Sequence, residues 1–238
     1  MKSTCLILTA TIQPSGPHIA ESDPDNRLAQ YKEALRFYTQ LPHDILFVEN
    51  SGFDFAQSEY LQELRNTGRV RFITVPRSSQ PEKGKGFQEF EMLDGVIDRV
   101  GRDYEAFVKV TGRYIVKNAG ALVATRLGDI RIDRHRKMKV AITGFFQCRV
   151  DFYQQHLRGI FQKADDAAGV FIEHVLYRRL AELEMNNAVG LFPQNPDYHG
   201  VSGSHGNSMQ RHPLKMKLRN VERRLLALTG NQEFLIEY

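Results

Sequence analysis

Short apolar segments alternate with amphipathic segments through the first half of the chain. The apolar segments, each of a length suited to one buried strand, are residues 5–12, 45–48, 70–75 and 106–110. The segments with apolar side chains at helical spacing are residues 27–41, 58–65 and 86–100. Asp25 is placed to cap the first of these helices. Such alternation predicts an α/β fold with a mostly parallel sheet flanked by helices.

The second half has a less regular pattern. Residues 140–146 and 147–151 are expected as strands, with a hairpin near Gly144. Three further segments are expected to be helical, namely residues 151–163, 167–184 and 213–228. No linker separates the halves, so residues 1–238 are expected to form one domain. Its two halves would be a nucleotide-binding half, 1–128, and an acceptor-side half, 129–238.

Composition is that of an ordinary globular protein, with 42% hydrophobic and 25% charged residues among 238. No apolar run approaches the roughly 20 residues that span a bilayer. Cys5 and Cys148 lie in separate apolar runs, which favours reduced core cysteines and a cytoplasmic protein. The net charge of +4 is unevenly distributed, because basic residues cluster at 131–139 and 215–224. Each cluster is read first as a solvated face, and otherwise as a contact for an anionic partner.

The residues that follow the predicted strands are the candidates for chemistry, because ligands of open α/β sheets collect at the carboxyl ends of the strands. Glu49 and Asn50 follow the second strand, where a carboxylate and an amide could bind a base or a ribose. The alternative, held equal to the first, is a turn closed by Gly52. Thr11 follows the first strand.

Cations follow the fourth apolar segment. Lys109 and Arg113 enclose Thr111 and Gly112, so fixed positive charge could meet a diphosphate at this point. The predicted helix 86–100 also has a basic entry. There Gly84 and Gly86 would allow close approach of a ligand to a helix N-terminus, and Lys85 would add a mobile cation. The spacing is not that of a Walker loop, and a surface loop with a capping glycine is the alternative.

The segment 199–206 holds three glycines, two serines and two histidines. Backbone N–H groups and hydroxyls of such a loop, including Ser202, Ser204 and His205, can form an anion-binding concavity. Two histidines alone do not make a zinc site. The alternative is a flexible connection.

Glu173 and His174 lie at the start of an amphipathic helix. Glu173 is the first candidate for a general base that takes a proton from an acceptor hydroxyl, and His174 is the second. A first-turn glutamate that only stabilises the helix dipole is an equally good interpretation of the spacing.

Taken in order, several of these segments form one pattern. Its members are Thr9-Ala10-Thr11-Ile12, residues 25–31 with Arg27, Phe47-Val48-Glu49-Asn50-Ser51, Gly84-Lys85-Gly86 with Glu89, Lys109-Val110-Thr111-Gly112-Arg113-Tyr114 and Gly203-Ser204-His205-Gly206. The pattern resembles bacterial glycosyltransferases of lipopolysaccharide, capsule and exopolysaccharide synthesis. The resemblance implies a GT-A-like, Rossmann-type sheet with a C-terminal acceptor-side lobe. The Asp-x-Asp metal motif of such enzymes is missing after the strand that ends at Val110.

The resemblance also implies roles for the candidate residues. Thr11, Arg27, Glu49 and Asn50 would line the nucleotide. The phosphates or donor sugar would face Gly84, Lys85, Gly86, Lys109, Thr111, Gly112 and Arg113. Ser202, Ser204 and His205 would close over the diphosphate, and Glu173 would be the catalytic base. No metal ligand is assigned and no cofactor is expected, with Mg²⁺ or Mn²⁺ as the alternative.

The expected enzyme is therefore an inverting, hexosyltransferase-like and metal-independent glycosyltransferase. Its donor would be a UDP-sugar, with CMP- or GDP-sugars as alternatives, and its acceptor a glycan or lipid-linked glycan. The basic segment 213–228 would allow peripheral contact with the inner membrane face, but its apolar stripe is expected to pack on the core. Two other functions stay open. One is a sugar nucleotidyltransferase, and the other is a non-catalytic binder of anionic lipid or RNA, although no nucleic-acid partner is expected.

Overall fold

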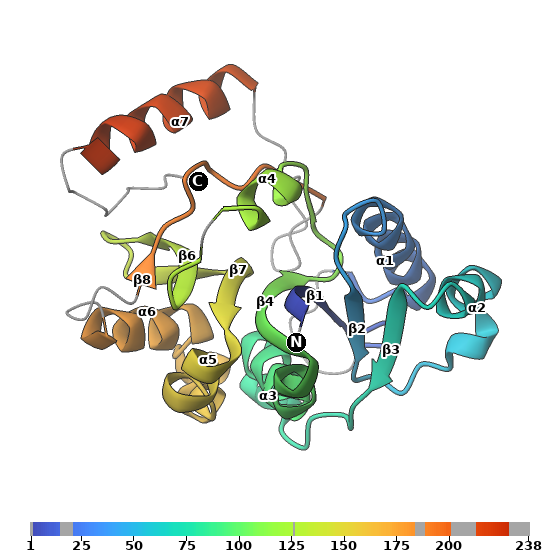
Figure 1. Ribbon diagram of the computed structural model, residues 1–238. Helices are drawn as coiled ribbons and strands as arrows, with labels where there is room; N and C mark the ends of the chain where they lie inside the picture. Colours follow the sequence, from blue (N-terminus) through green and yellow to red (C-terminus); the bar gives the residue numbers. More distant parts are fainter. Residues whose placement is uncertain (1, 15–20, 126, 184–188, 201–212, 229–238) are drawn as a thin grey trace.

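Seven strands form the main sheet of the described part of the chain, in the order β3-β2-β1-β4-β7-β6-β8 (Figure 1). The computed structural model describes residues 2–14, 21–125, 127–183, 189–200 and 213–228. The strands are β1 (Lys2–Ala10), β2 (Ile45–Glu49), β3 (Val70–Thr74), β4 (Tyr104–Thr111), β6 (Ile130–His135), β7 (Val140–Arg149) and β8 (Val189–Gly190). A separate antiparallel pair joins β5 (Ile115–Val116) to β9 (Tyr198–His199).

Neighbouring strands from β3 to β4 are parallel, and only β7 runs against its neighbours in the sheet. The helices that cover the sheet are α1 (Pro24–Tyr38), α2 (Glu59–Asn66), α3 (Lys85–Asp103), α4 (Ala119–Val123), α5 (Val150–His156) and α6 (Ile172–Leu183). The predicted α/β class, with a mostly parallel sheet flanked by helices, is confirmed.

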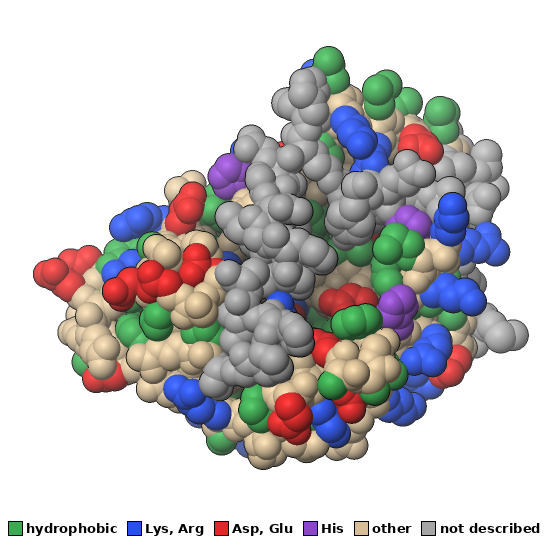
Figure 2. Space-filling view, turned by 180° about the vertical axis from the view of Figure 1, so that it is seen from behind, with side chains coloured by type: hydrophobic (Ala, Val, Ile, Leu, Met, Phe, Trp, Pro, Cys, Tyr) green, Lys and Arg blue, Asp and Glu red, His purple; other side chains and the backbone are tan. Residues whose placement is uncertain are grey.

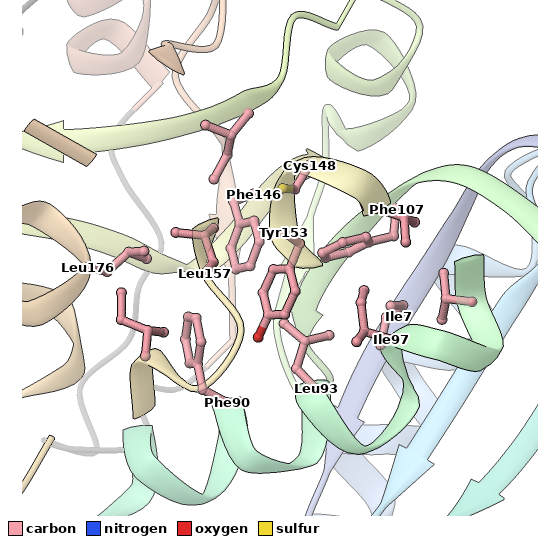
Figure 3. Close-up of a cluster of buried hydrophobic side chains, with 14 of the residues drawn as sticks. Ile7, Phe90, Leu93, Ile97, Phe107, Phe146, Cys148, Tyr153, Leu157 and Leu176 are labelled. Carbon is pink, nitrogen blue, oxygen red and sulfur yellow. The ribbon is translucent and has the colours of Figure 1, made fainter. Parts of the chain in front are cut away.

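Alternation along β1 divides the core into two layers. Cys5 and Ile7 point to the side of α3, α5 and α6, whereas Leu6 and Leu8 point to the side of α1, α2 and α4. In the first layer, aromatic rings from different elements meet: Phe107 of β4 packs edge-on against Tyr153 of α5 and against Phe146 of β7 (Figure 3). A strand buried on both faces has no polar side, which is why these segments appear as continuous apolar runs in the sequence.

The predicted elements of the first half are confirmed, with boundaries that shift by a few residues. The first helix begins at Pro24 rather than residue 27, because the carboxylate of Asp23 caps it by accepting the backbone N–H of Asp25. Asp25 therefore lies in the first turn and is not the cap. The division into halves 1–128 and 129–238 stays a prediction.

The hairpin expected near Gly144 is wrong. Residues 140–149 form the single strand β7, which pairs with β6 through a turn at residues 136–139. The turn has no glycine or asparagine, and Lys139 itself adopts the left-handed conformation with φ 54°. Gly144 lies inside this strand and does not mark a turn. Glycine suits the position because the ring of Tyr114 packs against it, and a Cβ would lie 3.2 Å from Tyr114 Cε2.

Two predicted helices are shorter than expected. The segment expected at 151–163 is α5 followed by the 3₁₀ turn η3 (Ile160–Lys163), with the break at Gly159, which has φ 73°. The segment expected at 167–184 begins as the 3₁₀ turn η4 (Asp166–Ala168) and becomes helical only in α6.

The basic segment forms α7 (Pro213–Leu228), as predicted, but its apolar stripe does not pack on the core. The helix is held instead by Arg223, whose guanidinium is buried and makes two bonds, of 2.7 and 2.8 Å, to the carboxylate of Asp133 in β6. Arg223 also donates to the Phe192 carbonyl and to Asn195 Oδ1, at 2.8 and 2.6 Å. No helix in the described ranges has the length and apolar character needed to cross a membrane.

The Arg223–Asp133 pair gives the first prediction. Arg223→Ala leaves a buried carboxylate without its cation, which should reduce the free energy of unfolding by about 3–5 kcal/mol. Urea denaturation measures this loss, and hydrogen exchange should show that α7 loses protection first. The matched control is Arg224→Ala, at the exposed neighbour, which should change stability by less than about 0.5 kcal/mol. Equal stability of the two variants would contradict the role given to Arg223.

Candidate functional site

The carboxyl ends of β1, β2 and β4 meet at one edge of the sheet because these strands are parallel and adjacent. β7 runs in the opposite direction, so its first half brings Thr143 to the same edge. The N-terminus of α3 and that of α6 also meet there: a Cβ on Gly86 would lie 2.2 Å from Ile172 Cγ2. On the face drawn in Figure 2, acidic and basic side chains lie next to one another around a hollow.

Glu89 of α3 is the centre of a hydrogen-bond network at this edge. Its Oε1 accepts from the hydroxyls of Thr9 (2.6 Å) and Thr111 (2.8 Å), which end β1 and β4. The ammonium of Lys109 lies 2.7 Å from the same oxygen. Lys109 also donates to Thr111 Oγ1 at 2.9 Å and to the Thr143 carbonyl at 2.7 Å. One carboxylate therefore joins α3 to two strands directly, and to β7 through the lysine.

Lys109 was predicted to face the diphosphate, but the structure gives its ammonium a different environment. The side chain is fully buried, and its three N–H donors have three acceptors inside the protein. Burial lowers the pKa of Lys109, and the adjacent charge of Glu89 opposes that shift. This geometry assigns Lys109 to positioning the strand ends.

Glu173 of α6, the predicted base, lies on the same network. Its Oε1 accepts from the hydroxyl of Thr143 at 3.1 Å, and the carbonyl of that same threonine accepts from Lys109. Burial raises the pKa of Glu173, and the negative charges of Glu89 and Asp166 raise it further, while hydrogen bonds lower it. A carboxylate with a raised pKa binds a proton more strongly and is the better base.

His174, the second candidate base, is directed elsewhere. Its Nδ1 lies 3.1 Å from the carbonyl of Lys139 in the β6–β7 turn, and its ring is near Phe171. Adjacent helical residues point about 100° apart, so the two candidate bases do not share a side of α6. The geometry favours Glu173.

Lys85, at the start of α3, lies within electrostatic reach of Glu173 and of two arginines. Burial lowers the pKa of Lys85, the charges of Arg113 and Arg27 lower it further, and Asp166 and Glu173 oppose the shift. Arg113 is buried at the end of the β4 turn, where its Nη1 donates to Gln30 Oε1 at 2.7 Å.

Arg27 has much of its hydrogen-bonding capacity engaged by its own loop. Its Nε donates to the Thr11 carbonyl at 2.7 Å and its Nη1 to the Glu21 carbonyl at 3.1 Å. These contacts hold the segment after β1 in place, and a nucleotide contact of Arg27 stays a prediction.

The glycines predicted at the start of α3 are required by close packing. A Cβ on Gly84 would lie 1.9 Å from Asp166 Oδ2, and the residue has φ 103°, which favours glycine. The carboxylate of Asp166 accepts the backbone N–H of Lys85, and burial raises the pKa of Asp166. An acidic side chain of the protein thus already lies at this helix N-terminus, where phosphate was expected.

Gly112 is required for a different contact. A Cβ there would lie 2.6 Å from the Thr9 carbonyl, which accepts the Gly112 N–H at 2.9 Å. The turn after β4 therefore lies directly on the end of β1.

Glu49 and Asn50 shape the neighbouring loops. The buried carboxylate of Glu49 accepts the N–H groups of Ile12 (3.1 Å), Ser51 (2.8 Å) and Phe53 (3.2 Å), as well as the Ser51 hydroxyl. The turn considered for this segment is therefore present, with the carboxylate as its acceptor and φ 74° at Gly52.

Asn50 is buried, and its Oδ1 accepts from the Thr11 hydroxyl at 2.7 Å. Thr11 and Asn50 thus lie side by side at the ends of β1 and β2, and their contact with a nucleotide stays a prediction.

Several contributors to this edge were not predicted as site residues. Arg77, after β3, donates to the Ser51 carbonyl, and Gln30 holds Arg113. Thr143 has no sequence signal, because its place depends on β7 running antiparallel to β4. Arg77 could have been found from the rule that gave Thr11, since it follows a strand of the same sheet. The predicted loop residues Ser202, Ser204 and His205 lie outside the described residues.

The residues at the β4 turn do not fit a divalent metal. GT-A enzymes with an Asp-x-Asp motif offer carboxylates there, whereas this chain offers the Thr111 hydroxyl, Gly112 and the Arg113 guanidinium. Glu89, the nearby carboxylate, is paired with Lys109. Within the described ranges, no three Cys, His, Asp or Glu side chains are grouped as ligands for a metal ion.

The chain matches no known family and no curated protein in sequence. Its fold is similar to that of the WbbM bifunctional glycosyltransferase in its apo form, with a TM-score of 0.55 and 10% identity. That match covers 99% of this chain and 46% of WbbM, so the chain spans less than half of that protein. A protein assigned as a nucleotide-diphospho-sugar transferase from Desulfovibrio desulfuricans G20 gives a TM-score of 0.45 and 12% identity, over 81% of this chain and 80% of the other. The fold is GT-A-like, as the resemblance implied.

The role of Lys109 can be tested without a donor. Lys109→Met leaves the half-buried carboxylate of Glu89 with two hydroxyls and no cation, so the free energy of unfolding should fall by about 1–3 kcal/mol. Lys117→Met, at an exposed lysine, is the matched control and should change it by less than about 0.5 kcal/mol. Denaturant unfolding of the free protein measures both. Unchanged stability of Lys109→Met, together with weaker donor binding, would show instead that Lys109 is a phosphate ligand.

Proposed function

We propose that this protein is a glycosyltransferase that moves a sugar from a nucleotide-sugar donor to a hydroxyl of a glycan or lipid-linked glycan. One observation carries the proposal: the cation of Lys85 lies within electrostatic reach of both Glu173 and Arg113 where the N-termini of α3 and α6 pack together, at the carboxyl edge of a GT-A-like sheet. The reaction needs a base and positive charge. The carboxylate of Glu173 would remove a proton from the acceptor, and the cations of Lys85 and Arg113 would stabilise the leaving diphosphate.

The proposed donor orientation follows the sheet. The nucleotide would lie over the ends of β1 and β2, where Thr11 and Asn50 are hydrogen-bonded together. The diphosphate would lie toward Arg113 and Lys85, with UDP as the first candidate nucleotide and CMP or GDP as alternatives. Arg27 would hold the loop under the nucleotide, because its guanidinium is bonded to the Thr11 carbonyl.

The proposed chemistry is a direct displacement. The carboxylate of Glu173 takes the proton of the acceptor hydroxyl as its oxygen attacks the anomeric carbon, and the bond from that carbon to the phosphate oxygen breaks. The electron pair leaves with the nucleoside phosphate, where Arg113 and Lys85 face the increased negative charge. One base and one displacement would give inversion at the anomeric carbon.

Metal independence is part of the proposal. It is supported by the guanidinium of Arg113 at the turn after β4, where a metal-binding enzyme of this fold would have carboxylates. Fixed cations do not have to be recruited from solution, and their positions are set by Gln30 and by the packing at Gly84. The proposed setting is the synthesis of bacterial surface polysaccharide, such as lipopolysaccharide or capsule, on the cytoplasmic side.

Donor binding tests the function directly. A UDP-, CMP- or GDP-sugar at 100 times its dissociation constant should stabilise the fold by about 2.7 kcal/mol, in EDTA as well as in Mg²⁺ or Mn²⁺. Thermal unfolding measures this, with Arg113→Gln expected to weaken the response and Arg99→Gln, at an exposed arginine, expected to keep it. Stabilisation that requires a divalent metal would contradict metal independence. No response to any nucleotide sugar would contradict the proposed function.

The base is tested by pH. Glu173→Gln should reduce transfer about 10²–10⁴-fold and leave donor binding intact. Thr143→Val removes a hydrogen bond that lowers the pKa of Glu173, so that pKa should rise further. Because the carboxylate form is active, the acid limb of the kcat/KM profile should move to higher pH, whereas Thr143→Ser should keep it in place. An unmoved limb in Thr143→Val, or full activity of Glu173→Gln, would contradict the assignment.

A further inference from the structure

The outer side of α7 has an apolar ridge that is exposed in the described part of the chain. Its members are Leu214, Leu218, Val221 and Leu225, which are 64%, 72%, 54% and 59% exposed. They make up most of the large hydrophobic side chains that are exposed in the described part of the chain. A contiguous exposed apolar strip of this kind marks an interaction surface.

The ridge faces outward because of how α7 is attached. Met216 and Arg223 are the buried side chains of the helix, and they lie seven residues apart on one side of it. At about 100° per residue, the ridge lies roughly opposite to them. The Arg223–Asp133 ion pair therefore fixes the polar side of α7 against β6 and the apolar side toward the surroundings.

Basic side chains border the ridge. Lys215, Lys217 and Arg224 are exposed beside it, with Glu222 as the one acidic neighbour in this stretch. The β6–β7 turn, which follows Asp133 along the chain, also combines an exposed apolar side chain with basic residues. Met138 is 55% exposed there, between two lysines. In Figure 1, α7 lies over the end of the sheet that contains β6 and β8.

We propose that this ridge binds the surface of an anionic phospholipid bilayer. The apolar side chains would enter the boundary between headgroups and acyl chains while the flanking lysines and arginine meet lipid phosphates. The Met138 turn would be a second contact. Binding to lipid does not depend on sugar transfer, so this proposal can fail while the proposed function holds, and the reverse.

Charge decides against the main competing occupant, a second copy of α7. The ridge spacing of four, three and four residues would suit a short helix pair, in which Lys215, Lys217, Glu222 and Arg224 would flank the seam. Three of these four side chains are positive, so two copies would bring mostly like charges together. An anionic bilayer attracts the same set.

Vesicle cosedimentation of the full chain tests the proposal. The protein should bind vesicles of phosphatidylcholine with phosphatidylglycerol, and bind pure phosphatidylcholine much more weakly. Lys215→Gln/Lys217→Gln should reduce partitioning about fivefold for each charge removed. Arg99→Gln/Arg102→Gln, which changes the net charge equally at exposed sites on α3, should change it little. Leu218→Ser/Leu225→Ser should reduce partitioning at least about tenfold.

Circular dichroism and donor-induced thermal shifts should be unchanged in these variants, which shows that the fold is intact. Binding to anionic vesicles that survives Leu218→Ser/Leu225→Ser would overturn the proposal, because another surface would then be responsible. Absence of vesicle binding would also overturn the proposal. In that case light scattering would show either a monomer or a dimer, and a dimer that the same substitutions dissociate would assign the ridge to self-association.

Discussion

The candidate site depends on one ion pair, between the fully buried Lys109 of β4 and the half-buried Glu89 of α3. A buried charge costs several kcal/mol unless a partner and hydrogen bonds compensate it, and here the compensation comes from three strands. Thr9 and Thr111 donate to the carboxylate, and the Thr143 carbonyl accepts from the ammonium. The polar groups at the carboxyl edge are thus satisfied by one another, and the strand ends are held in the relative positions that a ligand would meet.

This pair also sets the charge around Glu173. Burial raises the pKa of Glu173, and the negative charges of Glu89 and Asp166 raise it further. The hydroxyl of Thr143 donates to the glutamate and opposes the shift. The network thus holds Glu173 through Thr143, whose carbonyl accepts from Lys109.

Sequence periodicity predicted the first half of the sheet because its strands and helices follow one another in regular order, and because Asp, Gly and Pro end each element. It gave Thr11, Asn50 and Arg113 one edge because parallel strands end together, whereas Glu173 was a candidate only from its place at the start of a helix. It failed at the β6–β7 turn, where lysine adopts a conformation that glycine usually marks. It also could not show that Lys109 would be enclosed by Glu89, since spacing along a strand indicates which side a residue faces but not which partner occupies that side.

The direction of α7 shows the same limit. Helical spacing identifies an apolar stripe and a polar side with equal clarity, and the hydrophobic effect alone would turn the stripe toward the core. Arg223 reverses that choice, because its guanidinium has acceptors from Asp133, Phe192 and Asn195 in a buried pocket. Turning the helix over would bury the ridge but would leave Asp133 without a cation, so the ion pair offsets a large part of the free energy gained by burying apolar side chains. An apolar surface kept exposed by a buried ion pair is more readily explained by a partner for that surface than by the packing of the protein alone.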